Sequence, residues 1–197
     1  MSVAEKLDIL LQDNKGVLRT ADVIKAGISK VSFYEYVKER GLEKVFHGTF
    51  VSKDAWADPM YLLSLRYGQT IFSHETALYL HNLTDREPMQ YNVTAKTGYN
   101  TSNLLKADVK VYSIKKDLFE LGKIKIITPF GNEVSTYNKE RTICDILRSR
   151  NKIELQTFQE AIKGYFQSKD KNLRLLWKYA KSFKVDKLLS KYTEVLL

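Results

Sequence analysis

Three short helical stretches followed by a hairpin, all within the first 57 residues, constrain the fold of this chain most strongly. The spacing of apolar residues predicts helices over residues 3–12, over about 21–26, and from Ser29 to about Arg40. A tight turn at Gly27 joins the second helix to the third. Two helices joined in this way, with a further helix before them, are typical of a helix-turn-helix.

Residues that cap helices mark the ends of these stretches. We expect Thr20 and Ser29 to be the N-caps of the second and third helices, and Gly41 to end the third. The next segment, EKVFHGTFVS, alternates apolar and polar residues around His47-Gly48, which predicts two short strands joined by a turn. Three helices and a hairpin in this order predict a winged helix-turn-helix, which is a DNA-binding arrangement.

The third helix can be sorted into faces at about 100° per residue. Phe33, Tyr36 and Val37 share one face, which we expect to pack on the first two helices. Because the N-terminal part of a recognition helix approaches base edges in the major groove, the candidate contacts there are Ser29, Lys30, Ser32, Tyr34 and Lys38. Arg19 and Thr20 are candidates to hold a phosphate at the start of the second helix, and Lys44, His47, Thr49 and Lys53 are candidates for contacts from the wing.

The alternative interpretation is that these side chains are ordinary solvated polar residues on a small helical cap. Glu35 lies among them and would repel phosphate. Residues 1–57 also carry 9 Lys and Arg against 8 Asp and Glu, a net charge of only +1. Since phosphate contacts dominate affinity for DNA, we expect part of the affinity to lie outside this segment.

The sequence pattern changes after the hairpin. Two helices are predicted over about 58–67 and 74–82, and four segments rich in Val, Ile, Thr and Tyr predict four strands between Met89 and Tyr137. The last 60 residues contain four apolar stripes at helical spacing. The expected fold is therefore α+β in two domains: a winged helix-turn-helix over residues 1–57, and a mixed domain over 58–197 with a small β-sheet and a helical C-terminal part.

Motifs for catalysis are weak. His74-Glu75 begins like the zinc-protease motif HExxH, but the next histidine is His81, seven positions on instead of four. Asp108 and Lys110 have the D-x-K order of some nucleases, in what reads as an alternating strand without an acidic partner upstream. Cys144 lies in an apolar helical stretch, where we expect it to fill space in the core. We therefore expect no catalytic residues, no metal, no cofactor and no enzymatic activity.

Composition restricts the compartment and the class of partner. The formal net charge of +9 favours an anionic partner, and residues 58–197 contribute 23 Lys and Arg against 15 Asp and Glu, a net +8. One cysteine excludes an intrachain disulfide, which fits a reducing cytoplasm. No apolar run approaches the roughly 18 residues of a membrane span, and the first residues mix acids among leucines, unlike a signal peptide. We expect a cytoplasmic protein without a membrane partner.

Two C-terminal helical stretches carry basic side chains at helical spacing. Lys171, Arg174, Lys178 and Lys181 lie along one expected helix, and Lys184, Lys187 and Lys191 along the next. Such stripes are commonly the solvated backs of amphipathic helices. The alternative is a basic patch that holds a phosphate backbone, either as a second contact to DNA or as a site for the nucleic acid or nucleotide of a partner.

The layout of the whole chain resembles the AbiEi antitoxin family. The resemblance rests on HGTFV in the hairpin, IFSHETALYLHNL after it, the strand-rich middle, and KERTICDILRSR before the last helices. It implies an N-terminal winged helix-turn-helix, a C-terminal antitoxin domain, and a place in a bacterial abortive-infection operon that acts in phage defence. It implies repression of that operon through inverted repeats in promoter DNA.

The resemblance also implies a functional partner, a nucleotidyltransferase-like toxin of the AbiEii type. In such type IV pairs the antitoxin opposes the toxin without forming a stable complex with it. Two alternatives stay open. The first is an antitoxin that neutralises by direct contact, with its basic helices on an acidic toxin surface. The second is a winged-helix transcription regulator whose second domain senses a ligand.

Overall fold

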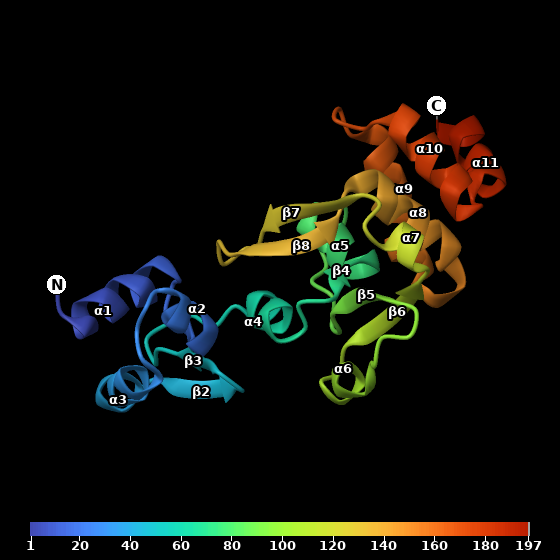
Figure 1. Cartoon of the computed structure of the whole chain (residues 1–197). Helices are drawn as coiled ribbons and strands as arrows, with labels where there is room; N and C mark the ends of the chain where they lie inside the picture. The colour runs from blue at the N-terminus through green and yellow to red at the C-terminus, as the bar shows by residue number, and fades with distance from the viewer. Residues whose placement is uncertain (197) are drawn as a thin grey trace. The chain divides into compact units, whose positions relative to one another are not determined.

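The computed structural model of the chain describes residues 1–196 and divides into two compact units, Met1–Pro59 and Met60–Leu197 (Figure 1). The division lies two residues beyond the boundary expected at Ala57. Each unit has its own apolar core and is described by itself. Within residues 1–196, no helix is both long enough and apolar enough to cross a membrane.

The first unit combines three helices with one small sheet. Its elements follow in the order α1 (Val3–Asp13), β1 (Val17–Arg19), α2 (Thr20–Lys25), α3 (Lys30–Arg40), β2 (Glu43–Phe46) and β3 (Thr49–Val51). The sheet has the order β1-β3-β2, and both pairings are antiparallel. This arrangement is compatible with the expected winged helix-turn-helix.

The ends of α3 are formed by the residues that the sequence predicts. The Ser29 side chain accepts a hydrogen bond from the backbone N–H of Ser32 at 3.1 Å, and Gly41 ends the helix at φ +63°. The cap expected for α2 is wrong, because Arg19 holds the N-cap position and Thr20 is the first helical residue. The backbone N–H of Thr20 donates instead to the carbonyl of Gly48 at 2.8 Å, which ties α2 to the tip of the β2–β3 hairpin.

The second unit is built on a mixed five-stranded sheet in the order β6-β5-β4-β8-β7. Its strands are β4 (Ile71–Phe72), β5 (Asn92–Lys96), β6 (Lys110–Ile114), β7 (Lys123–Ile127) and β8 (Glu133–Tyr137). β5 pairs with β6, and β4 with β8, in parallel, whereas the β4–β5 and β7–β8 pairings are antiparallel. The four expected strands are therefore present, and β4 is a fifth that the sequence pattern does not reveal.

Helices cover both faces of this sheet. They are α4 (Pro59–Arg66), α5 (His74–Leu80), α6 (Ser102–Lys106), α7 (Lys116–Phe119), α8 (Lys139–Arg148), α9 (Leu155–Gln167), α10 (Leu173–Phe183) and α11 (Asp186–Leu196), with a 3-10 turn at Arg150–Lys152. Ile71 faces a large core formed with α5 and α8–α11, and its neighbour Phe72 faces a smaller core formed with α4 and α6. The second unit is thus α+β, with a small sheet and a helical C-terminal part (Figure 1).

The four apolar stripes of the C-terminal helices all lie on the large core. The stripes of α8 and α9 are fully buried, including Ile143, Ile146, Phe158 and Ile162. Those of α10 and α11 are buried at Leu176, Ala180 and Leu189, and only partly buried at Leu173, Trp177, Leu188 and Tyr192. Val185, expected on the last stripe, is buried directly before α11. Cys144 is buried in the same core, as expected, and burial raises the pKa of its thiol.

Candidate nucleic-acid interface

The inner face of α3 is fixed on the rest of the first unit. Phe33 is fully buried and Tyr36 is 3% exposed. The hydroxyl of Tyr36 donates to Asp8 of α1 at 2.6 Å, and Arg40 donates to the other oxygen of that carboxylate, also at 2.6 Å. Burial and the hydrogen bond to Asp8 raise the pKa of Tyr36 to about 12. These contacts set which side of α3 turns toward solvent.

The outer face of α3 presents a stripe of four exposed side chains at the spacing i, i+3, i+4 and i+7. They are Val31, Tyr34, Glu35 and Lys38, with Lys30 exposed at the edge of the stripe. Val31 lies at the centre of the exposed arc and is 69% exposed. An exposed aliphatic side chain on a recognition helix can contact the methyl group of thymine.

Val31 is absent from the contacts predicted from the sequence, which include only polar and aromatic residues. The signal available in the sequence is its angle on the helix, opposite the apolar side chains of Phe33 and Val37. Apolar side chains at helical spacing usually face a core, so residue type alone does not indicate an exposed Val31. On α3 the core is already filled by the opposite face.

The ring of Tyr34 is held in place although half of the residue is exposed. Its centroid lies 5.8 Å from that of Phe50 on β3 in an edge-to-face arrangement, and 5.6 Å from that of Phe33. Aromatic pairs of this geometry restrict the ring. Tyr34 is therefore a rigid contact group on the outer face.

Two of the predicted serine contacts take part in the helix cap. The hydroxyl groups of Ser29 and Ser32 lie 2.9 Å apart, and Ser29 also accepts the backbone N–H of Ser32. Ser32 is only partly exposed. Both serines therefore take part in the N-terminal cap of α3.

The start of α2 is less suited to a phosphate than expected. The guanidinium of Arg19 donates to both carboxylate oxygens of Asp22, at 2.5 Å from Nε and 2.8 Å from Nη2. The backbone N–H of Thr20 is already bonded to the carbonyl of Gly48, so it is not free to bind a phosphate. An acid that neutralises Arg19 weakens its attraction for DNA.

The predicted wing contacts divide into exposed and buried residues. Lys44, His47 and Lys53 are exposed, and Gly48 at the hairpin tip has φ +70°. Thr49 is only 2% exposed, so its prediction as a surface contact is wrong. The reason is that β3 is the central strand of the sheet, between β1 and β2.

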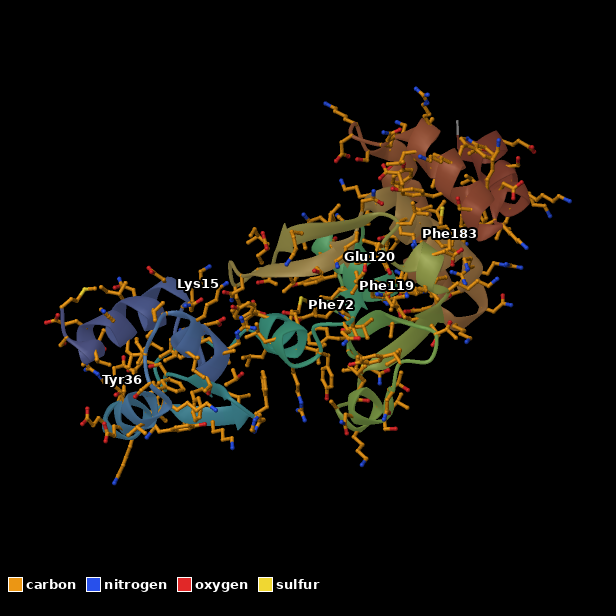
Figure 2. The ribbon with its side chains drawn as sticks, viewed as in Figure 1. Lys15, Tyr36, Phe72, Phe119, Glu120 and Phe183 are labelled. Carbon is orange, nitrogen blue, oxygen red and sulfur yellow. The ribbon has the colours of Figure 1, made fainter. Side chains whose placement is uncertain are left out.

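The basic stripes of the second unit are largely exposed (Figure 2). Within residues 1–196, no carboxylate forms an ion pair with Arg174, Lys178, Lys181, Lys184, Lys187 or Lys191. Lys171 differs, because it is partly buried and donates to the carbonyl of Ser168 at 3.2 Å. Lys184 is predicted from the sequence to lie on the next helix, and this is wrong. It is the C-cap of α10, with φ +57°.

The weak catalytic motifs do not come together. The Nε2 atom of His81 lies 2.6 Å from the carbonyl of Tyr137, and His74 is buried against the ring of Tyr112. Asp108 lies at φ +55° in the turn before β6, so its placement in a strand is wrong. Among residues 1–196, no group of three or more His, Cys, Asp or Glu side chains is arranged to hold a metal ion.

Neither a protein-family model nor a curated protein sequence matches the chain. The structure is similar to the crystal structure of the RV2827C protein from Mycobacterium tuberculosis, with a TM-score of 0.59 and 14% sequence identity. The similarity covers 91% of this chain and 71% of that one. At this level of identity the similarity concerns the fold alone.

Proposed function

We propose that this chain is a DNA-binding repressor of its own promoter and the antitoxin of a type IV toxin-antitoxin pair. The observation that carries the DNA-binding part is the outer face of α3. One side of the helix is clamped to α1 by Tyr36 and Arg40, and the other presents Val31, Tyr34 and Lys38 to solvent. A fixed helix with an exposed face of mixed contact groups is what entry into a major groove requires.

The composition of this stripe favours particular contacts. Lys30 and Lys38 can reach phosphates or guanine, Val31 can contact a thymine methyl, and Glu35 can accept a hydrogen bond from the amino group of cytosine. Glu35, which counts against phosphate binding, fits a position over a base edge. The exposed Lys44 and His47 of the wing supply contacts beside the helix.

The charge balance supports a contribution from the second unit. Residues 1–57 carry a net charge of only +1, whereas residues 58–197 carry +8. The exposed cations of α10 and α11, which form no ion pair within residues 1–196, provide part of this excess. We propose that they strengthen DNA binding or hold the nucleic acid or nucleotide on which the toxin acts.

The antitoxin part of the proposal is supported by the resemblance of the whole chain to the AbiEi family. The proposed partner is an AbiEii-like nucleotidyltransferase toxin, opposed in the cytoplasm without a stable complex. The proposal includes no catalytic activity and no cofactor. Because the second unit has its own sheet and core, neutralisation is assigned to it and repression to the first unit.

The test is to separate the two activities in cells that carry the toxin and a promoter reporter. A variant lacking residues 1–59 should rescue growth and fail to repress, whereas Val31→Asp in the full chain should fail to repress and still rescue. A full chain that neither represses its promoter nor rescues cells from the neighbouring gene product would contradict both halves. Copurification of that product with the chain would favour neutralisation by direct contact.

Charge reversal tests the role of the basic helices. Lys178→Glu, Lys181→Glu and Lys187→Glu change exposed side chains, so circular dichroism should show an intact fold. Loss of rescue in the folded triple variant would support an electrostatic role. Full rescue would identify these lysines as a solvated surface.

A further inference from the structure

A small cavity lies in the second unit between the start of α5, the end of α8, and the strands β5 and β6. Its volume is about 30 Å³, and its polar walls include His74, Tyr112, Ser113, Arg141, Arg148 and Ser149. A single buried water needs roughly 10–15 Å³, so this space admits a compact group of a few atoms. A sugar or a base does not fit in it.

Arg141 forms one wall and is completely buried. Its guanidinium lies between the rings of Tyr137 and Phe183, at 4.1 and 4.0 Å from their centroids. Nη1 donates to the carbonyls of Leu118 and Leu121, at 2.8 and 2.9 Å. The side chain is therefore fixed on both faces and at one end.

The remaining edge of this guanidinium is not satisfied. Nε donates to Asp145 at 2.9 Å, but Nη2 is buried and has no hydrogen-bond partner within residues 1–196. Because Nε–H and one N–H of Nη2 point from the same edge of a guanidinium, Nη2 faces the side of Asp145, which also lines the cavity. A buried, unpaired guanidinium nitrogen requires a partner such as a water or an anion.

Further donors converge on the same space. Tyr112 also lines the cavity. Its buried hydroxyl has no hydrogen-bond partner by geometry in the described part of the chain, and the nearby ammonium group of Lys110 counteracts the rise in its pKa that burial causes. The hydroxyl of Ser149 lies 3.1 Å from Nε2 of His74, and the guanidinium of Arg148 lies 3.5 Å from the carboxylate of Asp145. The charged groups that line the cavity are thus two guanidinium groups against one carboxylate.

His74 adopts an unfavourable backbone conformation beside this cavity. Its φ is +51°, a conformation that a non-glycine residue rarely adopts. Its ring stacks on Tyr112 with centroids 3.4 Å apart, and Nδ1 is 2.9 Å from the hydroxyl of Ser73, which accepts from Thr94. Burial, followed by the charges of Arg148 and Lys110, holds the pKa of His74 well below its usual value. The neutral ring positions Ser149, and the surrounding cations leave a positive potential for an anion.

We propose that this cavity is a binding site for a single tetrahedral oxyanion, either inorganic phosphate or the terminal phosphate of a nucleotide. Nη2 of Arg141 and the guanidinium of Arg148 supply charged donors, and the hydroxyls of Tyr112 and Ser149 supply neutral ones. Arginine suits such a group because its planar fork matches phosphate oxygens. Arg148 and Ser113 are exposed and Ser149 is partly exposed, so access is from their side.

The experiment compares phosphate binding by the full chain and by two matched arginine variants. Arg148→Gln removes a donor from the cavity, and Arg150→Gln removes the same charge two residues away from a side chain that does not line it. Thermal stabilisation and calorimetric titration with inorganic phosphate are measured at constant ionic strength, balanced with chloride. The wild type and Arg150→Gln should bind alike, and Arg148→Gln should bind at least about tenfold more weakly, as expected for loss of a charged hydrogen bond.

Adenosine and adenosine 5′-monophosphate identify the source of the phosphate group. Displacement of phosphate by the nucleotide, but not by the nucleoside, assigns the site to a terminal phosphate, whereas displacement by neither assigns it to the free ion. No stabilisation of the wild type by phosphate would overturn the proposal, because the cavity would then hold water. Equal phosphate binding by Arg148→Gln and Arg150→Gln would also overturn it, since the anion would bind elsewhere on this basic chain.

Discussion

Replacing Arg141, which is completely buried, by methionine should destabilise the second unit more than single changes on the surface of that unit. The change keeps much of the apolar stem but leaves the carboxylate of Asp145, which is 2% exposed, with only Arg148 at 3.5 Å. Burial raises the pKa of this carboxyl even with Arg141 acting against the shift. Removing one partner of a buried ion pair costs about 3–5 kcal/mol. Two backbone carbonyls, those of Leu118 and Leu121, also lose their donor.

A double-mutant cycle divides this cost. Asp145→Leu alone should also cost about 3–5 kcal/mol, because it leaves the buried Arg141 guanidinium without its counterion. In the double variant neither charge remains, and the cost reduces to about 2–6 kcal/mol for the two carbonyls that lose a donor, at about 1–3 kcal/mol each. The double variant should therefore lose roughly half of the sum of the single losses.

The chain provides its own probe for this measurement. It has two tryptophans, of which Trp56 lies in the first unit and Trp177 packs against the core of the second. In a Trp56→Phe background, urea unfolding followed by fluorescence reports on the second unit alone. Additive losses, or a loss below about 1 kcal/mol for Arg141→Met, would refute the argument that this pair is a buried and mutually dependent unit.

Three further predictions follow from individual contacts. Asp8→Ala should lower the stability of the first unit by about 1–2 kcal/mol, because the hydroxyl of Tyr36 on α3 loses its acceptor. Asp13→Ala, at an exposed position on α1, the helix that also carries Asp8, should change the stability little. Hydrogen exchange of the α1 and α3 amides measures both. The pKa of His74 is lower in the folded chain than in the unfolded chain, so its contribution to stability is complete above about pH 6.5. Below that pH the contribution falls by about 1.4 kcal/mol per pH unit until the folded-state pKa is reached. His74→Asn, which tolerates the positive φ, should therefore make the free energy of unfolding less dependent on pH in this acid range. Lys184→Gly should stabilise the second unit by about 0.5–1 kcal/mol because φ is +57° there, and Lys181→Gly, within α10, should destabilise it by about 1 kcal/mol in the same thermal scan.

Local signals in the sequence predict much of the first unit. Ser29 and Gly41 act within one turn of α3, so their roles follow from residue type alone. β1 has three residues and β4 has two, too few to show a period, and both are missed. The omission of β1 explains the wrong prediction for Thr49. β1 pairs with β3, which makes β3 a central strand and buries Thr49, whereas a hairpin alone would leave Thr49 exposed.

The polar cavity in the second unit could not be predicted from local patterns. Arg141 lies in KERTICDILRSR, where a charged residue in a helix is expected to face solvent. Its burial depends on Tyr137 and on Phe183, which is 42 residues further along the chain. In the sequence, His74 stands out only as the first residue of an incomplete HExxH motif, whose second histidine is missing at the required position. Its positive φ and its contact with Ser149 arise from the meeting of α5 with the end of α8.

The most direct test of the central claim is the affinity of the full chain for its own promoter, measured by fluorescence anisotropy at fixed salt with a shuffled duplex of equal length as reference. Val31→Asp places a carboxylate at the centre of the outer face of α3, and Ile9→Asp makes the same kind of change on α1, at a side chain that is 46% exposed. The wild type and Ile9→Asp should prefer the promoter alike, and Val31→Asp should lose at least about tenfold in promoter affinity, the equivalent of one good base contact or more. Equal affinity of the wild type for both duplexes, or an unchanged preference in Val31→Asp, would contradict the assignment of DNA recognition to this face.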